Sequence, residues 1–194
     1  MSRASCSRSN GSRPPTPREG RASITVPMCG LGWISSKTGE YTVITCVDGH
    51  KAINGAAFPG RIGMFTKGMS ACFSVIVVGS GGAIMAHIPA YLGHPSPPMP
   101  HKAELKAMKA GFAQIWNAHR AELAIHTVAI IPGEFTNEGQ MKALFGHIFP
   151  QVAATRAQVW PCKKTPNPRT GSHGAALVMA APSKEIYVED IKKM

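Results

Sequence analysis

The stretch Cys72-Phe-Ser-Val-Ile-Val-Val78, with Gly79-Ser80 and then Gly81-Gly-Ala-Ile-Met-Ala-His-Ile88, decides the fold. Two apolar runs of strand length flank a glycine and a small polar residue, a pattern typical of a two-residue β-hairpin. If Gly79 and Ser80 form the loop, the register places Cys72 directly opposite His87. We therefore expect a thiol and an imidazole on one face of an antiparallel sheet, with Cβ atoms about 4.5–5.5 Å apart.

This pairing of Cys72 and His87 matters because a cysteine nucleophile and its base require that geometry. A neighbouring imidazolium stabilises the thiolate, which is the form that attacks. Taken alone, each residue also has an ordinary structural interpretation. A single cysteine in an apolar strand is commonly a small buried hydrophobe, and a single histidine on a neighbouring strand is commonly part of the packing.

The chain divides into a basic tail, residues 1–24, and one domain, residues 25–194. The tail is rich in Ser, Arg and Pro without apolar periodicity, and this composition predicts a disordered segment. It has no apolar core of a secretory signal peptide, and prolines at 14, 15 and 17 oppose the amphipathic helix of a transit peptide. The rest of the chain contains enough apolar residues, 44% of the whole, to form a single core.

Further elements follow from periodicity and turn residues. Besides the hairpin we expect strands over 41–47, 61–66, 125–131, 155–160, 175–180 and 185–188, with the last two joined over Ala181–Lys184. Helices are predicted from His101 to Leu123, and from Thr136 or Asn137 to Phe149. Strands outnumber helices and several neighbours look antiparallel. The predicted fold is α/β, an α+β sandwich with a mixed, largely antiparallel sheet flanked by helices.

Composition limits the classes of function. The net charge of +11 favours an acidic partner, whether nucleic acid, anionic lipid or an acidic protein surface, although solubility alone also explains such a charge. No apolar run reaches the roughly 18 residues that span a bilayer, which excludes a membrane-spanning protein. The five cysteines form no paired motif, which favours a reducing compartment and gives no zinc site. We predict neither a metal nor an organic cofactor.

Two short motifs carry a resemblance to a known family. Met69-Ser-Ala-Cys72 resembles the Leu-Ser-Gly-Cys motif of bacterial glutamine deamidase toxins, namely the cytotoxic necrotizing factor catalytic domain and Burkholderia lethal factor. Thr66, six residues before Cys72, matches the spacing of a threonine in the lethal factor and in the chemoreceptor deamidase CheD. Gly82-Ala-Ile-Met-Ala-His-Ile88 resembles the CheD segment that carries its histidine, and the order of elements that follows is also similar to CheD.

The resemblance implies a protein-glutamine deamidase. Cys72 would attack the glutamine carboxamide, His87 would move the proton, and Thr66 would hold the other ring nitrogen through its hydroxyl or its backbone carbonyl. The turn containing Gly68, Ser70 and Ala71, with the Cys72 amide, would supply N–H groups to the oxyanion. Ala71 replaces the family's glycine, so a positive φ at that position would be strained.

The implied partner is a folded protein with an accessible glutamine, with acidic residues around it to match the basic chain. The motif is closer to the toxins than to the chemotaxis enzyme, which favours an effector that acts in the cytosol of another cell. Transglutaminase-like transfer and proteolysis use the same acyl-enzyme and stay open. A non-enzymatic, basic nucleic-acid-binding module also stays open.

Secondary candidates are weaker. His94 and His101 are expected at the rim of a site, and Ser172-His-Gly174 in a loop that could border it. Trp33, Trp116 and Trp160 are expected in the core rather than on a binding surface.

Overall fold

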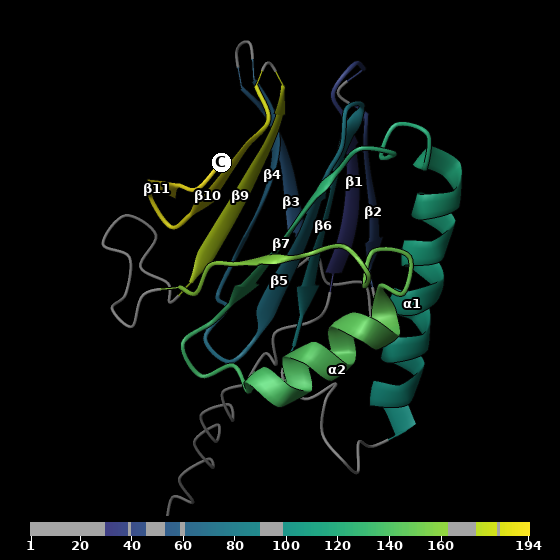
Figure 1. Cartoon of the computed structure of the whole chain (residues 1–194), viewed down its shortest axis with the longest axis vertical. Helices are drawn as coiled ribbons and strands as arrows, with labels where there is room; N and C mark the ends of the chain where they lie inside the picture. The colour runs from purple at the N-terminus through teal and green to yellow at the C-terminus, as the bar shows by residue number, and fades with distance from the viewer. Residues whose placement is uncertain are drawn as a thin grey trace, which may run out of the picture.

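Figure 1 shows a computed structural model of the chain. The structure describes residues 30–38, 40–45, 53–58, 61–89, 99–162, 174–181 and 183–194. The expected tail, His94 and residues 172–173 lie outside the described residues, and so does the side chain of His101. The tail and these rim candidates therefore stay predictions.

Eleven described strands form two sheets. The six-stranded sheet has the order β2-β1-β6-β5-β7-β8 and consists of β1 (Gly30–Ser35), β2 (Tyr41–Thr45), β5 (Phe73–Val78), β6 (Gly82–Ile88), β7 (Thr127–Pro132) and β8 (Gln158–Val159). The five-stranded sheet has the order β11-β10-β9-β4-β3 and consists of β3 (Ile53–Phe58), β4 (Arg61–Lys67), β9 (Ala175–Ala181), β10 (Glu185–Val188) and β11 (Ile191–Lys192). The described neighbours are antiparallel except β7 and β8, which run parallel. The largely antiparallel character expected from the sequence is confirmed.

Two helices, α1 (Met99–His119) and α2 (Glu138–Ile148), pack on one face of the six-stranded sheet, and the five-stranded sheet covers the other face (Figure 1). The molecule therefore has three layers: sheet, sheet and helices. This arrangement confirms the predicted α+β class. The sequence did not predict the division into two sheets, because β1 and β3 contain glycines that weaken the strand pattern.

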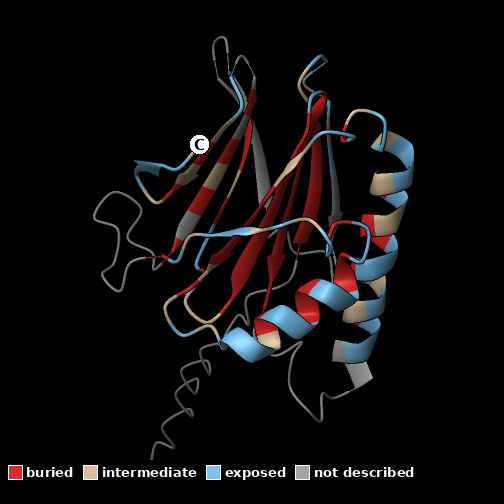
Figure 2. Ribbon diagram, viewed as in Figure 1, coloured by how far each residue is buried: buried red, intermediate tan, exposed pale blue. Residues whose placement is uncertain are grey.

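The central strands are buried on both sides, as the red strands of Figure 2 show. Along β5, Phe73, Val75 and Val77 pack towards the helices, whereas Ile76 and Val78 pack towards the other sheet. This alternation follows from the period of two in a strand. Two cores result, and they share one sheet.

Both predicted helices exist close to their predicted positions. On α1, Met108 and Phe112 are fully buried, while Lys102 and Lys109 on the opposite side are exposed, as the 3.6-residue pattern indicated. The N-cap of α2 is Asn137, whose side chain accepts a hydrogen bond from the Gln140 amide at 2.9 Å. Capping explains why α2 begins where the sequence predicted.

Candidate active site

The hairpin between β5 and β6 positions the candidate site, and its register differs from the prediction. The Gly79 amide donates to the Gly82 carbonyl at 2.9 Å, so the loop is Ser80-Gly81 rather than Gly79-Ser80. Contacts at the tip explain the choice. The Gly81 amide and the Ser80 hydroxyl both donate to the carbonyl of Glu122, at 3.0 and 2.9 Å. Anchoring of the tip to the turn that follows α1 therefore selects a register that the local sequence did not predict.

As a consequence, Ser74 pairs directly with His87, and the predicted direct pairing of Cys72 with His87 is wrong. The register is displaced by two residues, which is one full period of side-chain alternation. Cys72 and His87 therefore stay on the same face of the sheet, as diagonal neighbours. Such neighbours lie about 7–8 Å apart between Cα atoms, somewhat less between Cβ atoms. The two side chains share a face without being in register.

His87 contacts Thr66 across the two sheets. Thr66 lies on β4 of the five-stranded sheet, and its Oγ1 lies 2.7 Å from Nδ1 of His87. Both side chains are fully buried between the sheets. Of the two Thr66 atoms considered from the sequence, the structure thus places the hydroxyl against the ring.

Burial also sets the protonation state of His87. Desolvation lowers the pKa of His87 from 6.5 to about 4, so the imidazole is neutral at pH 7. Its Nε2 is buried and has no hydrogen-bond partner among the described residues. It follows that no hydrogen bond joins Nε2 to the Cys72 thiol in this conformation. The ring is thus hydrogen-bonded through Nδ1, whereas Nε2 has no hydrogen bond to any described residue.

Ser74 is a polar residue of this site that the sequence reasoning missed. It is fully buried directly opposite His87, and its hydroxyl donates to the Ala86 carbonyl at 2.9 Å. Because alternate residues of a strand point to the same face, Ser74 faces the five-stranded sheet, as do Cys72 and Ile76 on either side of it. The signal was a hydroxyl residue interrupting an apolar run, but only the corrected register connects it with His87. Three of the four buried polar side chains in the described part of the chain, Thr66, Ser74 and His87, therefore gather between the sheets.

Cys72 itself lies at the edge of this polar group. Its side chain is only 3% exposed and belongs to the core between the sheets. Its backbone carbonyl accepts from the Gly133 amide at 2.9 Å and from the Thr136 hydroxyl at 2.7 Å. The position of Cys72 is thus fixed through its main chain by the connection between β7 and α2.

The candidate oxyanion turn is anchored by backbone hydrogen bonds. Gly68 adopts φ of +76°, a conformation that favours glycine. Ala71 is not among the described residues with positive φ, so the strain expected at that position does not occur. The Met69 amide donates to the Gly174 carbonyl, and the Ser70 carbonyl accepts from the Phe135 amide at 2.8 Å.

Gly133 lies directly beneath this turn. A Cβ atom at Gly133 would overlap the carbonyl oxygen of Met69. The close approach of two backbone segments therefore requires glycine here. The Gly133 amide also donates a hydrogen bond to the Cys72 carbonyl. Gly133 therefore joins the turn, the start of β5 and the end of β7.

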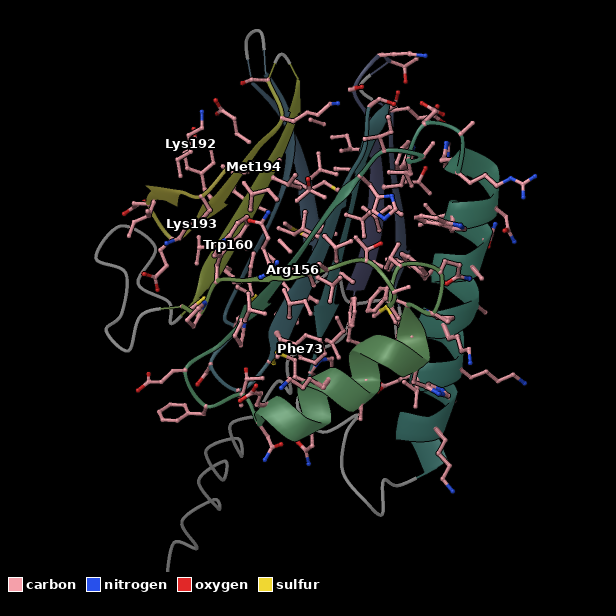
Figure 3. All side chains as sticks on the ribbon, in the orientation of Figure 1. Phe73, Arg156, Trp160, Lys192, Lys193 and Met194 are labelled. Atoms are coloured by element: carbon pink, nitrogen blue, oxygen red, sulfur yellow. The ribbon has the colours of Figure 1, made fainter. Side chains whose placement is uncertain are left out.

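The three tryptophans occupy the cores as expected. Trp33 is buried, and its ring stacks on that of His119 with centroids 4.1 Å apart. Trp116 is partly buried against the helix-facing core, next to Phe112. Trp160 packs at the margin of the core between the sheets, as does Met194, and both are labelled in Figure 3.

Two features of the described residues bear on other classes of function. The described residues contain no group of three or more His, Cys, Asp or Glu side chains that could hold a metal ion. Among them there is also no helix with the length and apolar character needed to cross a bilayer.

No protein-family model matches the sequence. A search of curated proteins also found no match.

Proposed function

We propose that this protein is a cysteine-dependent protein-glutamine deamidase. The observation that carries the proposal is the 2.7 Å contact between Thr66 Oγ1 and His87 Nδ1. Three residues chosen from sequence motifs, Thr66, Cys72 and His87, lie on three different strands or strand ends, yet all border the space between the sheets. A buried histidine oriented by a hydroxyl, on the same face as a cysteine, is an arrangement of base and nucleophile.

The proposed reaction needs a lone pair on Nε2 of His87. In the tautomer whose Nδ1–H donates to Thr66 Oγ1, Nε2 carries that lone pair. Nε2 accepts the proton of the Cys72 thiol as Sγ forms a bond to the carboxamide carbon. The proton passes to the departing nitrogen, the C–N bond breaks, and ammonia leaves. Water, deprotonated by Nε2, then cleaves the thioester to give glutamate and the thiol.

Access is part of the proposal because Cys72 is 3% exposed and His87 only 1% exposed. A glutamine side chain reaches Sγ only after the structure opens next to the start of β5. We infer that binding of the protein substrate drives this opening, as in induced fit. In the closed state the imidazole is already neutral, as a general base must be, but no hydrogen bond joins its Nε2 to the thiol, and this keeps the dyad inactive.

The substrate in this proposal is a folded protein with an accessible glutamine, and acidic residues near that glutamine would match the net charge of +11. The nucleophile requires a reduced thiol, and we therefore infer that the reaction takes place in a reducing cytosol. An effector delivered into the cytosol of another cell is consistent with both features. No metal or organic cofactor enters the chemistry.

The experiment is mass analysis of proteins incubated with the purified protein. Conversion of one glutamine to glutamate adds about 1 Da and releases one equivalent of ammonia, which follows from hydrolysis of an amide. The matched control is Cys72→Ser, which keeps the size of the side chain. Mass gain that persists with Cys72→Ser would refute the proposal.

A second measurement separates the related chemistries. With an added primary amine such as methylamine, a transglutaminase-like enzyme transfers the acyl group to the amine and adds about 14 Da. A protease instead produces fragments. Deamidation predicts a dominant gain of about 1 Da under both conditions.

A further inference from the structure

A cleft of about 390 Å³ lies between the β7–α2 connection, the first turns of α2 and the end of the β8 segment. Its lining includes Pro132, Gly133 and Thr136 on one side and Val159 and Pro161 on the other. Gly133 and Thr136 are also the two residues that hydrogen-bond the Cys72 carbonyl. The cleft is thus connected through these two residues to the backbone of the proposed nucleophile, and it is large enough for one or two side chains.

Apolar side chains are exposed around this cleft. Val159, in its lining, is 51% exposed, and Phe135, between two lining residues in the chain, is 66% exposed. Both belong to the small group of large hydrophobic residues that are exposed in the described part of the chain. Met141 forms a buried apolar wall. An exposed apolar rim around a concave site marks an interaction surface.

The charge of the cleft is opposite to that of the whole chain. Glu134 lines it, and no hydrogen bond or ion pair joins the Glu134 carboxylate to another described residue. The other two charged lining residues, Glu138 and Lys142, neutralise each other at 2.7 Å. Among the described lining residues, Glu134 is therefore the charged group without a counterion, and beside apolar surface it selects for a cation.

β8 also presents an edge that is not paired with any other described strand. It is the last strand of the six-stranded sheet, and the amides of Trp160 and Cys162 point inward to β7, donating to Ile130 and Pro132. In a parallel ladder the intervening residues point outward, so the backbone of Val159 faces away from the sheet. An extended peptide can pair there, although Pro161 offers no second amide.

We propose that this cleft docks an extended segment of the protein substrate in which a bulky apolar residue adjoins Arg or Lys. The apolar residue contacts Phe135 and Val159, and the cation pairs with Glu134. The inference rests on the proposed deamidase function for its description of the segment as substrate. It adds a recognition element: acidic residues near the glutamine would match the net charge of +11, whereas the segment in the cleft is cationic.

The test measures binding in the inactive Cys72→Ala protein by amide NMR. The two probes are the synthetic peptide Ser-Leu-Arg-Leu-Gln-Ser and its counterpart with Glu in place of Arg. We expect the Arg peptide to shift the amides of Glu134, Phe135 and Val159, and the Glu peptide to bind about two- to fivefold more weakly, the range for one exposed ion pair. Glu134→Lys should reverse this preference, while Glu40→Lys, at an exposed position just before β2 and outside the cleft lining, should not.

An apolar pair of variants completes the test. Phe135→Ser should weaken binding of the Arg peptide about tenfold, as expected for loss of part of a buried aromatic contact. Ile125→Ser, at an 88% exposed residue away from the cleft lining, should leave binding unchanged. Shifts confined to other surfaces, or an unreversed preference in Glu134→Lys, would overturn the docking proposal.

The two proposals fail separately. Binding in the cleft, without deamidation of any protein by the wild type, would retain the docking site and reject the enzyme. If Glu134→Lys and Phe135→Ser instead deamidate a protein with the same KM as the wild type, the proposed enzyme activity is supported and the docking site is rejected.

Discussion

The two faces of the six-stranded sheet are built from the same strands but are used differently. On the face covered by α1 and α2, alternate residues of β5 and β6 are entirely apolar, and Phe73 points towards α2 (Figure 3). On the face covered by the five-stranded sheet, the same strands contribute Ser74 and His87, next to Cys72. Buried polar groups lower stability unless they are hydrogen-bonded. The comparison shows that the helix-covered face contributes mainly to stability. The face covered by the five-stranded sheet buries polar groups, which lowers the stability gained there.

The largest expected effect is on activity and belongs to the polar face. In the proposed reaction His87→Asn should lower the deamidation rate about 10²- to 10⁴-fold, because it removes the proposed general base. The measurement is ammonia release at saturating substrate. Met85→Leu, two residues earlier on the same face of β6, is the matched control and should retain the rate. If His87→Asn and Met85→Leu had equal rates, the distinction between the two faces would lose its functional meaning.

The largest effect on stability belongs to the apolar face. Phe112→Ala on α1 should lower the free energy of unfolding by about 3–5 kcal/mol, because the ring is fully buried against Phe149 and a cavity remains. Urea denaturation measures this change. At temperatures where the variant stays folded, its rate per folded molecule should equal that of the wild type. A specific loss of rate would show that the helical face contributes to the site.

The third effect is a dependence of stability on pH. The pKa of His87 is about 4 in the folded protein, against 6.5 when the residue is solvated. Between these values the unfolded chain binds a proton that the folded protein does not, so stability falls as the pH decreases from 6.5 to 4. The loss amounts to about 3 kcal/mol for a shift of this size. The measurement is the free energy of unfolding by urea at about pH 7 and 4.5. The loss between these pH values should be larger in the wild type than in His87→Gln by this contribution, because the other titrating groups act equally in both proteins.

A smaller effect is expected for the hydroxyl that orients His87. Thr66→Val leaves Nδ1 buried without its 2.7 Å partner and should destabilise the protein by about 1–3 kcal/mol. The rate should also fall, because the tautomer is no longer fixed. Thr66→Ser retains the hydroxyl and should restore the rate and the pH profile of kcat. Equal rates in Val and Ser variants would show that Thr66 has only a packing role.

The smallest effect returns to the helical face. Asn137→Ala removes the side-chain cap of α2 and should reduce stability by about 1 kcal/mol. Thermal unfolding measures it, with Asn117→Ala on the exposed surface of α1 as a control that removes no cap. Activity should not change. A lower rate per folded molecule in Asn137→Ala would instead indicate that α2 is connected to the Cys72 region through Thr136.

Much of the fold could be predicted from the sequence because local patterns were strong there. Apolar periodicity identified α1, and Asn137 with Pro150 bounded α2. The strands at Tyr41, Arg61 and Ala175 were recognisable from alternation and turn residues. β1 was missed because it reads Gly-Leu-Gly-Trp-Ile-Ser, in which two glycines interrupt the strand pattern, although tertiary packing holds the segment in the sheet.

The candidate site was predicted in part. Motif spacing placed Thr66 and His87 in one site, and they are in contact. The register of the hairpin could not be predicted, because it depends on the carbonyl of Glu122, some forty residues away in the chain. The same error hid Ser74, since its relation to His87 exists only in the observed register. Burial of Cys72 likewise depends on a second sheet that the sequence did not reveal.

Gly133 gives the molecule an unusual genetic property. Because a single methyl group there would collide with the carbonyl of Met69, the mildest possible change, Gly133→Ala, should displace Met69 and the loop before Cys72, while the helix-facing core, which contains neither residue, stays intact. Such an allele would produce a protein that retains its helix-facing core but lacks the proposed activity. It would let a geneticist separate the presence of the protein in a cell from its action there, without touching its reactive atoms.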